Sequence, residues 1–157
     1  RVEPVELRPL AEEAAETVRA TARGVEIVVA TPTGFIAHAD ADHLYRILLN
    51  LTRNAADALQ AAGPVEGESG RITISAYALD ESTDAIEVAD NGPGVDLDSR
   101  AHLFEPFSAT TRRGGTGLGL AIVAELARGH GGDVALIDGP GATFRVTLPR
   151  PPVAPAT

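Results

Sequence analysis

Apolar residues recur at the spacing of an amphipathic helix in three stretches of the chain. In the first stretch, Leu10, Ala14 and Val18 form one stripe, and three glutamates lie off that stripe. The second stretch begins at Asp40, a residue type that caps helix N-termini, and the third follows a run of glycines. The pattern predicts helices over residues 9–23, 40–62 and 117–129.

Six shorter stretches have the character of β-strands. Residues 71–79 are the clearest, because Ile72, Ile74 and Ala76 alternate with polar residues, as in a half-buried strand. The Asp-Gly-Pro-Gly sequence at 138–141 is typical of a hairpin turn between two strands. The predicted strands are residues 25–30, 35–38, 71–79, 85–89, 133–137 and 143–148.

The order of these elements favours a two-layer α/β sandwich, because pairs of strands alternate with helices and the connections are short. We expect a mixed, mostly antiparallel sheet with the three helices covering one face. A doubly wound parallel sheet fits less well, since several neighbouring strands have no helical crossover between them. Residues 1–150 form the expected domain, and residues 151–157 a flexible, proline-rich tail.

Composition narrows the classes of function. The 157 residues are 44% apolar, which suits a globular core, and the net charge of −9 argues against binding to nucleic acid. No apolar run is long enough to span a membrane, so we expect no membrane contact by this fragment. The absence of cysteine excludes disulfides and thiolate metal sites and fits a cytoplasmic location. The first residue is Arg1 rather than Met, so we expect a fragment of a longer parent protein, whose membrane anchoring stays open.

Polar side chains recur on one face of the second predicted helix. Asn50, Asn54 and Asp57 follow one another at steps of four and three, beside the apolar stripe. Asparagine is a poor helix former, so two in adjacent turns cost roughly several tenths of a kcal/mol relative to alanine. One interpretation is a solvated outer face. The position beside the core favours a ridge that faces a cleft, where an amide oxygen can ligate a hard cation such as Mg²⁺.

A predicted strand leads directly into Asp90, which is followed by Asn-Gly-Pro-Gly. Gly92 and Gly94 flank the proline, and glycine lets a flat ligand approach the backbone closely. The acid can therefore lie in a ligand pocket, or the stretch can be an ordinary surface turn. The residues alone leave the two interpretations open.

Four glycines lie within residues 114–119 and lead directly into the third predicted helix. The free N–H groups and the positive dipole end of that helix would face the glycine loop, which is the arrangement of an anion site. The P-loop and dinucleotide-binding patterns are both absent, since the chain has no Lys and position 120 is Leu. A phosphate site remains possible, and a glycine hinge is compatible with it. Arg112 and Arg113, just upstream, are the candidate charged donors.

Residues between the turn after Asp90 and the glycine run show little periodicity. A loop of this length in a compact domain is usually a lid or disordered. Phe104 and Phe107 bracket a Glu-Pro pair and give the segment an apolar foothold. We interpret it as a lid, hinged on glycine, that excludes water from an occupied site.

These three elements, in this order, resemble the ATP-binding domain shared by gyrases, heat-shock chaperones, histidine kinases and mismatch-repair proteins, and in particular the catalytic domain of bacterial sensor histidine kinases. The resemblance extends from about Val5 to Arg150. It implies the fold of that superfamily, the Bergerat ATP-binding fold. It also implies a two-component kinase activity, in which the γ-phosphoryl group of Mg·ATP passes to a histidine on a separate dimerisation hairpin, with a response regulator as a further partner.

The resemblance also assigns roles to single residues. Asn54 corresponds to the asparagine that holds Mg²⁺ against the triphosphate, and Asp90 to the acid that reads the adenine amino group. Thr143 corresponds to the hydroxyl that supports this acid, and residues 104–107 to the phenylalanine box of the lid. The residues predicted to bind the nucleotide are Asn54, Asp57, Asp90, Gly92, Gly94, Phe104, Phe107, Arg112, Arg113, Gly115, Gly117, Leu118, Gly119 and Thr143.

Asn50 separates the branches of this superfamily. The gyrase and chaperone ATPases carry a water-activating Glu at this place, one helical turn before the metal asparagine. The amide of Asn50 cannot act as a general base near neutral pH, so we assign Asn50 and Asn54 to phosphoryl transfer rather than to hydrolysis. Asp57 stands where many of these kinases carry Lys or Arg. A phosphate contact from that position is therefore absent or supplied by an arginine such as Arg53.

The phosphoacceptor of the family is a His followed by Glu or Asp, and none of the four histidines in this chain fits: His38, His43, His102 and His130. We expect each of them to be structural or on the surface, and the acceptor to lie on another part of the polypeptide or on another chain. Two alternatives stay open. A nucleotide-sensing pseudokinase is disfavoured by the intact metal asparagine and glycines, and an anti-sigma-type serine kinase by the Phe-bracketed lid and Asn50.

Overall fold

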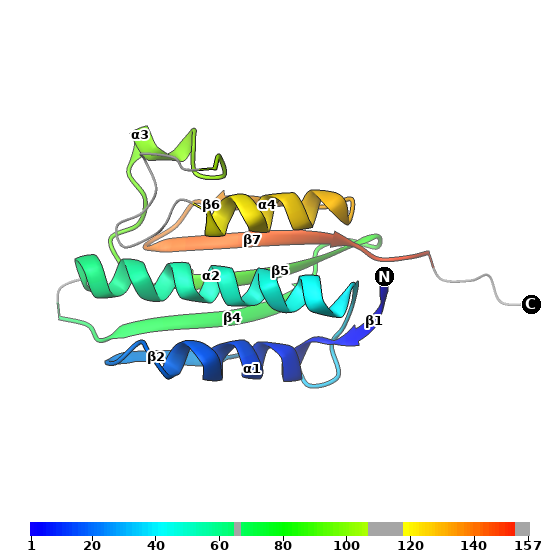
Figure 1. Ribbon diagram of the computed structural model, residues 1–157, viewed down its shortest axis with the longest axis horizontal. Coiled ribbons are helices and arrows are strands. Elements are labelled where there is room, and N and C mark those ends of the chain that lie inside the picture. The colour runs from blue at the N-terminus through cyan, green and yellow to red at the C-terminus, as the bar shows by residue number, and fades with distance from the viewer. Residues whose placement is uncertain (65–66, 107–117, 153–157) are drawn as a thin grey trace, which may run out of the picture.

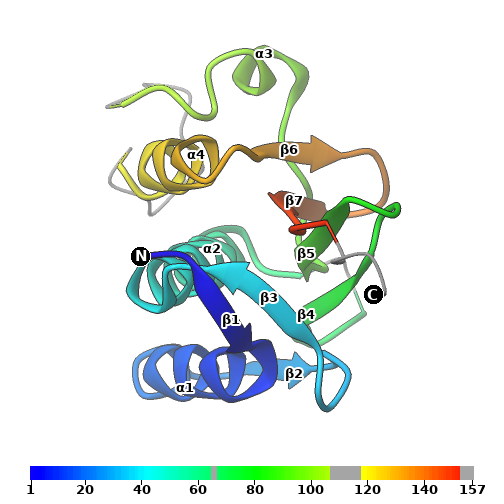
Figure 2. The same cartoon turned by 90° about the vertical axis from the view of Figure 1, so that its right-hand side faces the viewer.

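The computed structural model describes residues 1–64, 67–106 and 118–152. Three helices lie against one face of a sheet: α1 (Leu7–Arg19), α2 (Ala41–Ala62) and α4 (Gly119–Gly129). Figure 1 shows α2 in the middle of this helical layer, and Figure 2 shows α1, α2 and α4 on one side of the molecule and the main sheet on the other. The predicted two-layer α/β sandwich is confirmed.

The main sheet has five strands in the order β2 (Val25–Val29), β4 (Gly70–Ala78), β5 (Thr83–Asp90), β7 (Ala142–Pro149) and β6 (Asp133–Ile137). Strands β2 and β4 are parallel, whereas the other three neighbouring pairs are antiparallel. The β4–β5 and β6–β7 pairs are hairpins, as their short polar connections predict. The sheet is therefore mixed and mostly antiparallel.

The first strand forms a second, smaller sheet that the sequence does not predict. Strand β1 (Glu3–Glu6) pairs with β3 (Ile36–Ala39) in an antiparallel ribbon, separate from the main sheet. The four residues of β1 include two glutamates and a proline, which carry no strand pattern by themselves. Only the pairing with β3, distant in the chain, makes this segment a strand.

Helix α2 contributes a large part of the hydrophobic core. Leu44, Ile47, Leu48 and Leu51 are fully buried, and each such side chain contributes about 1.5–3 kcal/mol of hydrophobic free energy. Asp40 caps the helix as predicted, because its carboxylate accepts a hydrogen bond of 3.0 Å from the backbone N–H of His43.

Helix α1 begins and ends earlier than the predicted range of 9–23. Pro9 occupies the first turn, where its missing N–H would have no acceptor, so the helix can start before it. At the other end, the N–H of Thr21 donates to the carbonyl oxygen of Val18 at 3.1 Å, which tightens the last turn. Ala22 is still buried beyond the helix, and this extends the apolar pattern past the true end.

The predicted lid contains one short helix, α3 (Leu97–Arg100). The carboxylate of Asp96 accepts the N–H of Ser99 at 2.9 Å and caps this single turn. A helix of four residues is too short to show an amphipathic period, so the sequence pattern does not predict it.

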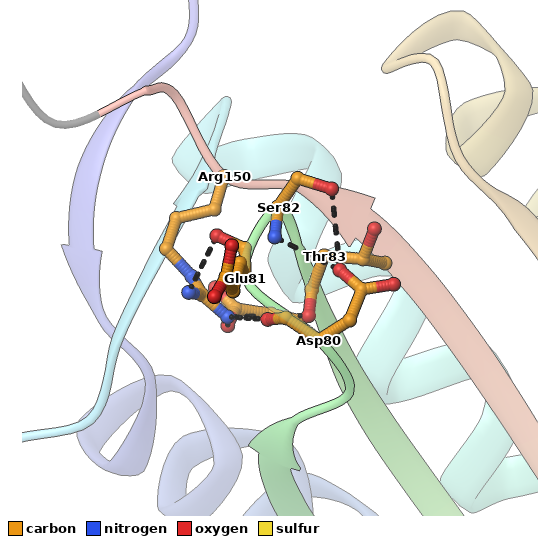
Figure 3. Close-up of polar contacts among 6 residues, drawn as sticks. Asp80, Glu81, Ser82, Thr83 and Arg150 are labelled. Atoms are coloured by element: carbon orange, nitrogen blue, oxygen red, sulfur yellow. Dashed lines mark hydrogen bonds and ion pairs between the residues drawn. The ribbon is translucent and has the colours of Figure 1, made fainter.

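Arg150 closes the domain at the end of β7 (Figure 3). Its guanidinium donates to the carbonyl oxygens of Asp80, Glu81 and Thr83 at 2.8, 3.0 and 3.2 Å. The backbone N–H of Arg150 donates to the carbonyl oxygen of Ser82 at 2.8 Å. The end of β7 is thereby fixed to the β4–β5 turn. Of the predicted tail, residues 153–157 lie outside the described part of the chain.

Candidate functional site

The polar face of α2 meets the start of α4. Asn50 is half-buried, and its Nδ2 donates to the carbonyl oxygen of Arg46 at 2.9 Å. Its Oδ1 lies 3.5 Å from the position that a Cβ would take at Gly119, the first residue of α4. The two helices therefore meet at this point, and a Cβ at position 119 would be in ordinary van der Waals contact with Asn50.

Asn54 lies one turn further along α2 and is only 9% exposed. Within the described residues, its buried Nδ2 has no hydrogen-bond partner. A buried donor without an acceptor costs about 1–3 kcal/mol, so such a group fits a position where a ligand supplies the acceptor. Its amide also carries an oxygen, which is a suitable ligand for a hard cation.

Asp57 completes the predicted ridge and is half-buried. Burial raises the pKa of its carboxyl, and the nearby charge of Arg53 acts in the opposite direction. The side chain thus carries its negative charge in a partly desolvated place beside Asn54.

Asp90, at the end of β5, has a nearly buried side chain that is only 5% exposed. Its Oδ1 accepts the N–H of Gly92 at 3.0 Å, which turns the chain sharply after the strand. A Cβ at Gly92 would lie 3.4 Å from the side chain of Leu59, near the C-terminal end of α2. The carboxylate is therefore buried near the point where the end of the strand meets the end of the helix.

Asn91 fixes the same turn from outside the predicted site. Its Oδ1 accepts the N–H of Arg71 at 2.7 Å, and its Nδ2 donates to the carbonyl oxygen of Ser69 at 2.6 Å. These bonds tie the residue after Asp90 to the start of β4, so Asn91 supports the position of the acid.

Gly141 is a residue of the site region that the sequence interpretation missed. A Cβ on Gly141 would lie 2.1 Å from the carbonyl oxygen of Asp90, and a Cβ on Gly94 would lie 2.9 Å from that of Gly141. Both glycines have positive φ values, of 68° and 86° respectively. The β6–β7 turn thus packs directly on the backbone of Asp90. The Asp-Gly-Pro-Gly hairpin signal was the available clue, but it does not indicate what the turn contacts.

The predicted support of Asp90 by Thr143 is wrong. The register of β5 and β7 pairs Asp90 with Ala142, whereas Thr143 pairs with Ala89. Successive side chains of a strand point to opposite faces of the sheet, so the hydroxyl of Thr143 lies on the other face from the carboxylate. Ala142, which has no hydroxyl, occupies the position beside Asp90.

The start of α4 forms the other end of the site. Leu118 is the N-cap residue and Gly119 the first helical residue, and a leucine side chain offers no acceptor to the first N–H groups of the helix. These groups, with the positive end of the helix dipole, favour an anion. The other predicted nucleotide-binding residues of this region lie outside the described residues: Phe107, Arg112, Arg113, Gly115 and Gly117.

Phe104 anchors the base of the predicted lid. Its ring meets that of Phe144, on β7, edge to face with the centroids 6.1 Å apart. Phe104 also lines a groove of about 450 Å³ that runs along the outer face of α4, and the other lining residues are Pro106, Leu118, Ala121, Ile122, Glu125 and Arg128. Leu118 belongs both to this groove and to the start of α4, so the groove begins at the anion end of the site.

The site therefore extends along α2 between two chemically different ends. Asn50 lies at the start of α4, and Leu59 lies at Gly92 beside Asp90. Nine residues of helix separate them, which is about 14 Å. A carboxylate at one end accepts hydrogen bonds, and the helix N-terminus at the other end favours an anion. This arrangement suits an elongated ligand with an N–H donor at one end and phosphate groups at the other.

None of the helices in residues 1–64, 67–106 and 118–152 has the combined length and apolar character needed to cross a bilayer. In the same ranges, no group of three His, Cys, Asp or Glu side chains is arranged so that it could hold a metal ion.

Comparison with known proteins agrees with this geometry. Residues 39–152 match the family model described as histidine kinase-, DNA gyrase B-, and HSP90-like ATPase. The chain is 42% identical over 120 residues to the nitrogen regulation protein NtrY of Azorhizobium caulinodans, and 40% identical over 117 residues to the histidine-protein kinase AtoS of Escherichia coli. These alignments cover 74% and 73% of this chain but only 15% and 18% of those proteins.

Solved structures give the same result over almost the whole chain. The mycobacterial sensor histidine kinase MprB superimposes with a TM-score of 0.76 at 30% identity, covering 94% of this chain and 97% of that one. The ATP-binding domain of PrrB from Mycobacterium tuberculosis superimposes with a TM-score of 0.74 at 27% identity, covering 96% and 98%. The chain therefore belongs to the family of histidine kinase-, DNA gyrase B- and HSP90-like ATPases, as an ATP-binding catalytic module of the sensor histidine kinase type.

Proposed function

We propose that this module, formed by residues 1–150, binds Mg·ATP and transfers the γ-phosphoryl group to a histidine on a separate dimerisation hairpin, from which a response regulator receives it. The observation that carries the proposal is the buried Nδ2 of Asn54, which has no hydrogen-bond partner among the described residues. Asn54 lies on α2 between Asn50, at the start of α4, and Leu59, beside the turn after Asp90. The names of the relatives NtrY and AtoS support the two-component context. Since the chain spans only a small part of those proteins, the acceptor and the regulator remain part of the proposal.

Each end of the site has a distinct proposed task. Asp90 accepts a hydrogen bond from the adenine amino group, while Gly92 and Gly94 leave room for the flat base. At the other end, the N-terminus of α4 binds the phosphates. The half-buried charge of Asp57 opposes a triphosphate, which makes neutralisation by a cation necessary.

Asn54 is the proposed protein ligand of the metal ion. Its amide offers an oxygen for the cation and, beside it, an N–H donor for a phosphate oxygen. A bound Mg²⁺ would neutralise the negative charge on the phosphoryl group during its transfer. Asn50 faces Gly119, so the start of α4 lies one helical turn of α2 from Asn54.

Asn50 also determines which acceptor the reaction favours. An amide cannot take a proton from water near neutral pH, and its Nδ2 is already engaged with the carbonyl oxygen of Arg46. We therefore expect very slow hydrolysis of ATP by the isolated module. An imidazole needs no such base, because its neutral nitrogen is itself a nucleophile.

The groove along α4 is the proposed entry for the acceptor. It begins at Leu118, beside the anion end of the site, and its apolar residues suit the side of a helix. Glu125 and Arg128 also line it and can orient a partner by charge.

The direct test combines this chain with a helical hairpin of its parent kinase, Mg²⁺ and ATP labelled in the γ-position. We expect acid-labile label on a histidine of the hairpin. Asn54→Ala should abolish the transfer, whereas Gln60→Ala, an exposed position of the same helix, should leave it intact. Binding of Mg·ATP without any transfer would identify a nucleotide sensor instead. Absence of binding would refute the whole assignment.

A further inference from the structure

His130 connects α4 to α2 at the C-terminal end of α4, the end remote from the proposed phosphate site. It follows the last residue of α4, and its Nε2 accepts the backbone N–H of Asp40, the N-cap of α2, at 3.1 Å. Its Nδ1 lies 2.8 Å from the carbonyl oxygen of Leu126. One ring thus joins the end of one helix to the beginning of the other.

These two contacts determine the protonation state of the ring. The N–H of Asp40 can only donate, so Nε2 must carry a lone pair. The carbonyl of Leu126 can only accept, so Nδ1 must carry the proton. The imidazole is therefore neutral and in its Nδ1–H form, whereas a free imidazole side chain favours a proton on Nε2. A second proton would place an N–H donor against the N–H of Asp40.

The charged and titratable groups around His130 come from three elements. On α2, Asp40 faces it, and the ring of His43 packs edge to face with the centroids 5.5 Å apart. On α4, Arg128 is paired with Asp133 of β6 at 3.1 Å. Asp40 itself is bonded to the amino group of Arg1 and to the N–H of His43, and these bonds lower its pKa to about 2. Asp40 therefore stays ionised throughout the range in which histidine titrates.

The contact between His130 and Asp40 affects the site because α2 and α4 run antiparallel. His130 meets Asp40 at one end of the pair, and Gly119 meets Asn50 at the other. About ten residues of helix, or roughly 15 Å, separate the two points on each helix. A helix is stiff over this length, so a displacement at His130 moves the N-terminus of α4 relative to Asn50.

We propose that His130 is a positioning residue for the nucleotide site: its neutral ring fixes the end of α4 on the cap of α2 and so holds the phosphate-binding start of α4 against Asn50. The effect on nucleotide affinity rests on the proposed function. The protonation state of the His130 ring does not depend on the proposed function, so an experiment can refute one without refuting the other.

The first test observes the ring directly in the ¹⁵N-labelled chain. Imidazole ¹⁵N chemical shifts at neutral pH should show Nδ1 protonated and Nε2 bare for His130, assigned by the loss of the signals in His130→Gln. A proton on Nε2 at neutral pH would overturn the proposal.

The second test compares affinities for Mg·ATP at neutral pH by calorimetry. His130→Gln keeps an oxygen that can accept the N–H of Asp40, whereas His130→Ala removes the acceptor. We expect His130→Ala to bind about two- to tenfold more weakly than the unaltered chain, the value of one net hydrogen bond, and His130→Gln to recover most of that loss.

Equal affinity of the unaltered chain and both variants would overturn the proposal. Absence of binding by all three proteins would instead overturn the proposed function, while the ring spectrum would still decide the state of His130. If the alanine variant does not fold, a loss of more than about tenfold in the glutamine variant would overturn the proposal.

Discussion

Arg150 and Asp84 form an ion pair that fixes the end of β7 to the beginning of β5. The Nη2 and Nε atoms of Arg150 lie 2.8 and 3.1 Å from Oδ1 of Asp84, and the carboxylate side chain is only 4% exposed. The same guanidinium also satisfies backbone carbonyl oxygens of the β4–β5 turn (Figure 3). A single side chain at the end of the domain therefore completes the hydrogen bonding of a distant turn.

Removal of this arginine should strongly destabilise the fold. Arg150→Ala leaves a buried carboxylate without its partner, which costs about 3–5 kcal/mol of the free energy of unfolding. Arg71→Ala is the matched control, since its ion pair with Glu26 is exposed and worth less than about 1 kcal/mol. Urea denaturation of both variants gives the comparison. Equal losses would show that the burial of Asp84 is of no consequence.

Asp90→Asn should remove nucleotide binding while preserving the fold. The amide oxygen can still accept the N–H of Gly92, but the charge proposed to receive the adenine amino group is gone. A hydrogen bond to a charged group is worth about 1.5–3 kcal/mol, so affinity should fall by about 10- to 100-fold or more. Asp138→Asn, at an exposed acid of the β6–β7 turn, is the control. Unchanged affinity in a calorimetric titration of Asp90→Asn would refute the adenine assignment.

Gly141→Ala should displace the backbone of Asp90, which packs against Gly141. The new Cβ would lie 2.1 Å from the carbonyl oxygen of Asp90, so the β6–β7 turn or the end of β5 must move. We expect a loss of stability of at least about 1–3 kcal/mol together with weaker nucleotide binding. Gly129→Ala, with open space around it at the end of α4, should change neither. Thermal melts and titrations of both variants distinguish a local clash from a general effect of added methyl groups.

The half-buried carboxyl of Asp57 predicts an unusual dependence of stability on pH. Burial raises its pKa, so its favourable contribution exists at acid pH, below the unfolded pKa of about 3.9, and is lost as the pH rises through the raised value. Asp57→Asn should therefore stabilise the domain at neutral pH, by less than about 1 kcal/mol because solvent screens the group. The gain should vanish near pH 4.

Asp96→Asn supplies a control of opposite sign for that prediction. The bonds from the side chain and backbone of Ser99 lower the pKa of Asp96, so its contribution is present at neutral pH and fades as the pH falls. Denaturation of both variants between acid and neutral pH should give curves of opposite slope. Parallel curves would contradict both assignments.

The pattern of apolar positions was sufficient to predict the three long helices, the strands of the main sheet and the class of fold. It failed where structure depends on a distant partner or on very few residues. Strand β1 exists through its pairing with β3, and α3 is a single turn held by its cap. Arg150 gives no sign in the sequence that it will bond to a turn far away in the chain.

In the candidate site as well, features set by local sequence could be predicted, whereas those set by contacts between distant segments could not. A helix face and a strand end determine where the side chains of Asn54 and Asp90 lie, whereas the roles proposed for them come from the resemblance to histidine kinases. The role assigned to Thr143 failed because a strand alternates with a period of two, so an error of one residue moves a side chain to the opposite face. The role of Gly141 was not predicted, because its packing against Asp90 depends on how the β4–β5 and β6–β7 hairpins meet.

The one parallel pairing of the sheet has a consequence for how the domain assembles and opens. The β4–β5 and β6–β7 pairs are local, whereas β2 reaches β4 only after β3 and the whole of α2 have been folded between them. Closing so long a loop costs chain entropy before any contact repays it. Strand β2 is also an edge strand, bonded on one side only within the main sheet. We therefore expect β2 to join the sheet late, and its amide protons to exchange with solvent before those of β4, β5 and β7, which are bonded on both sides.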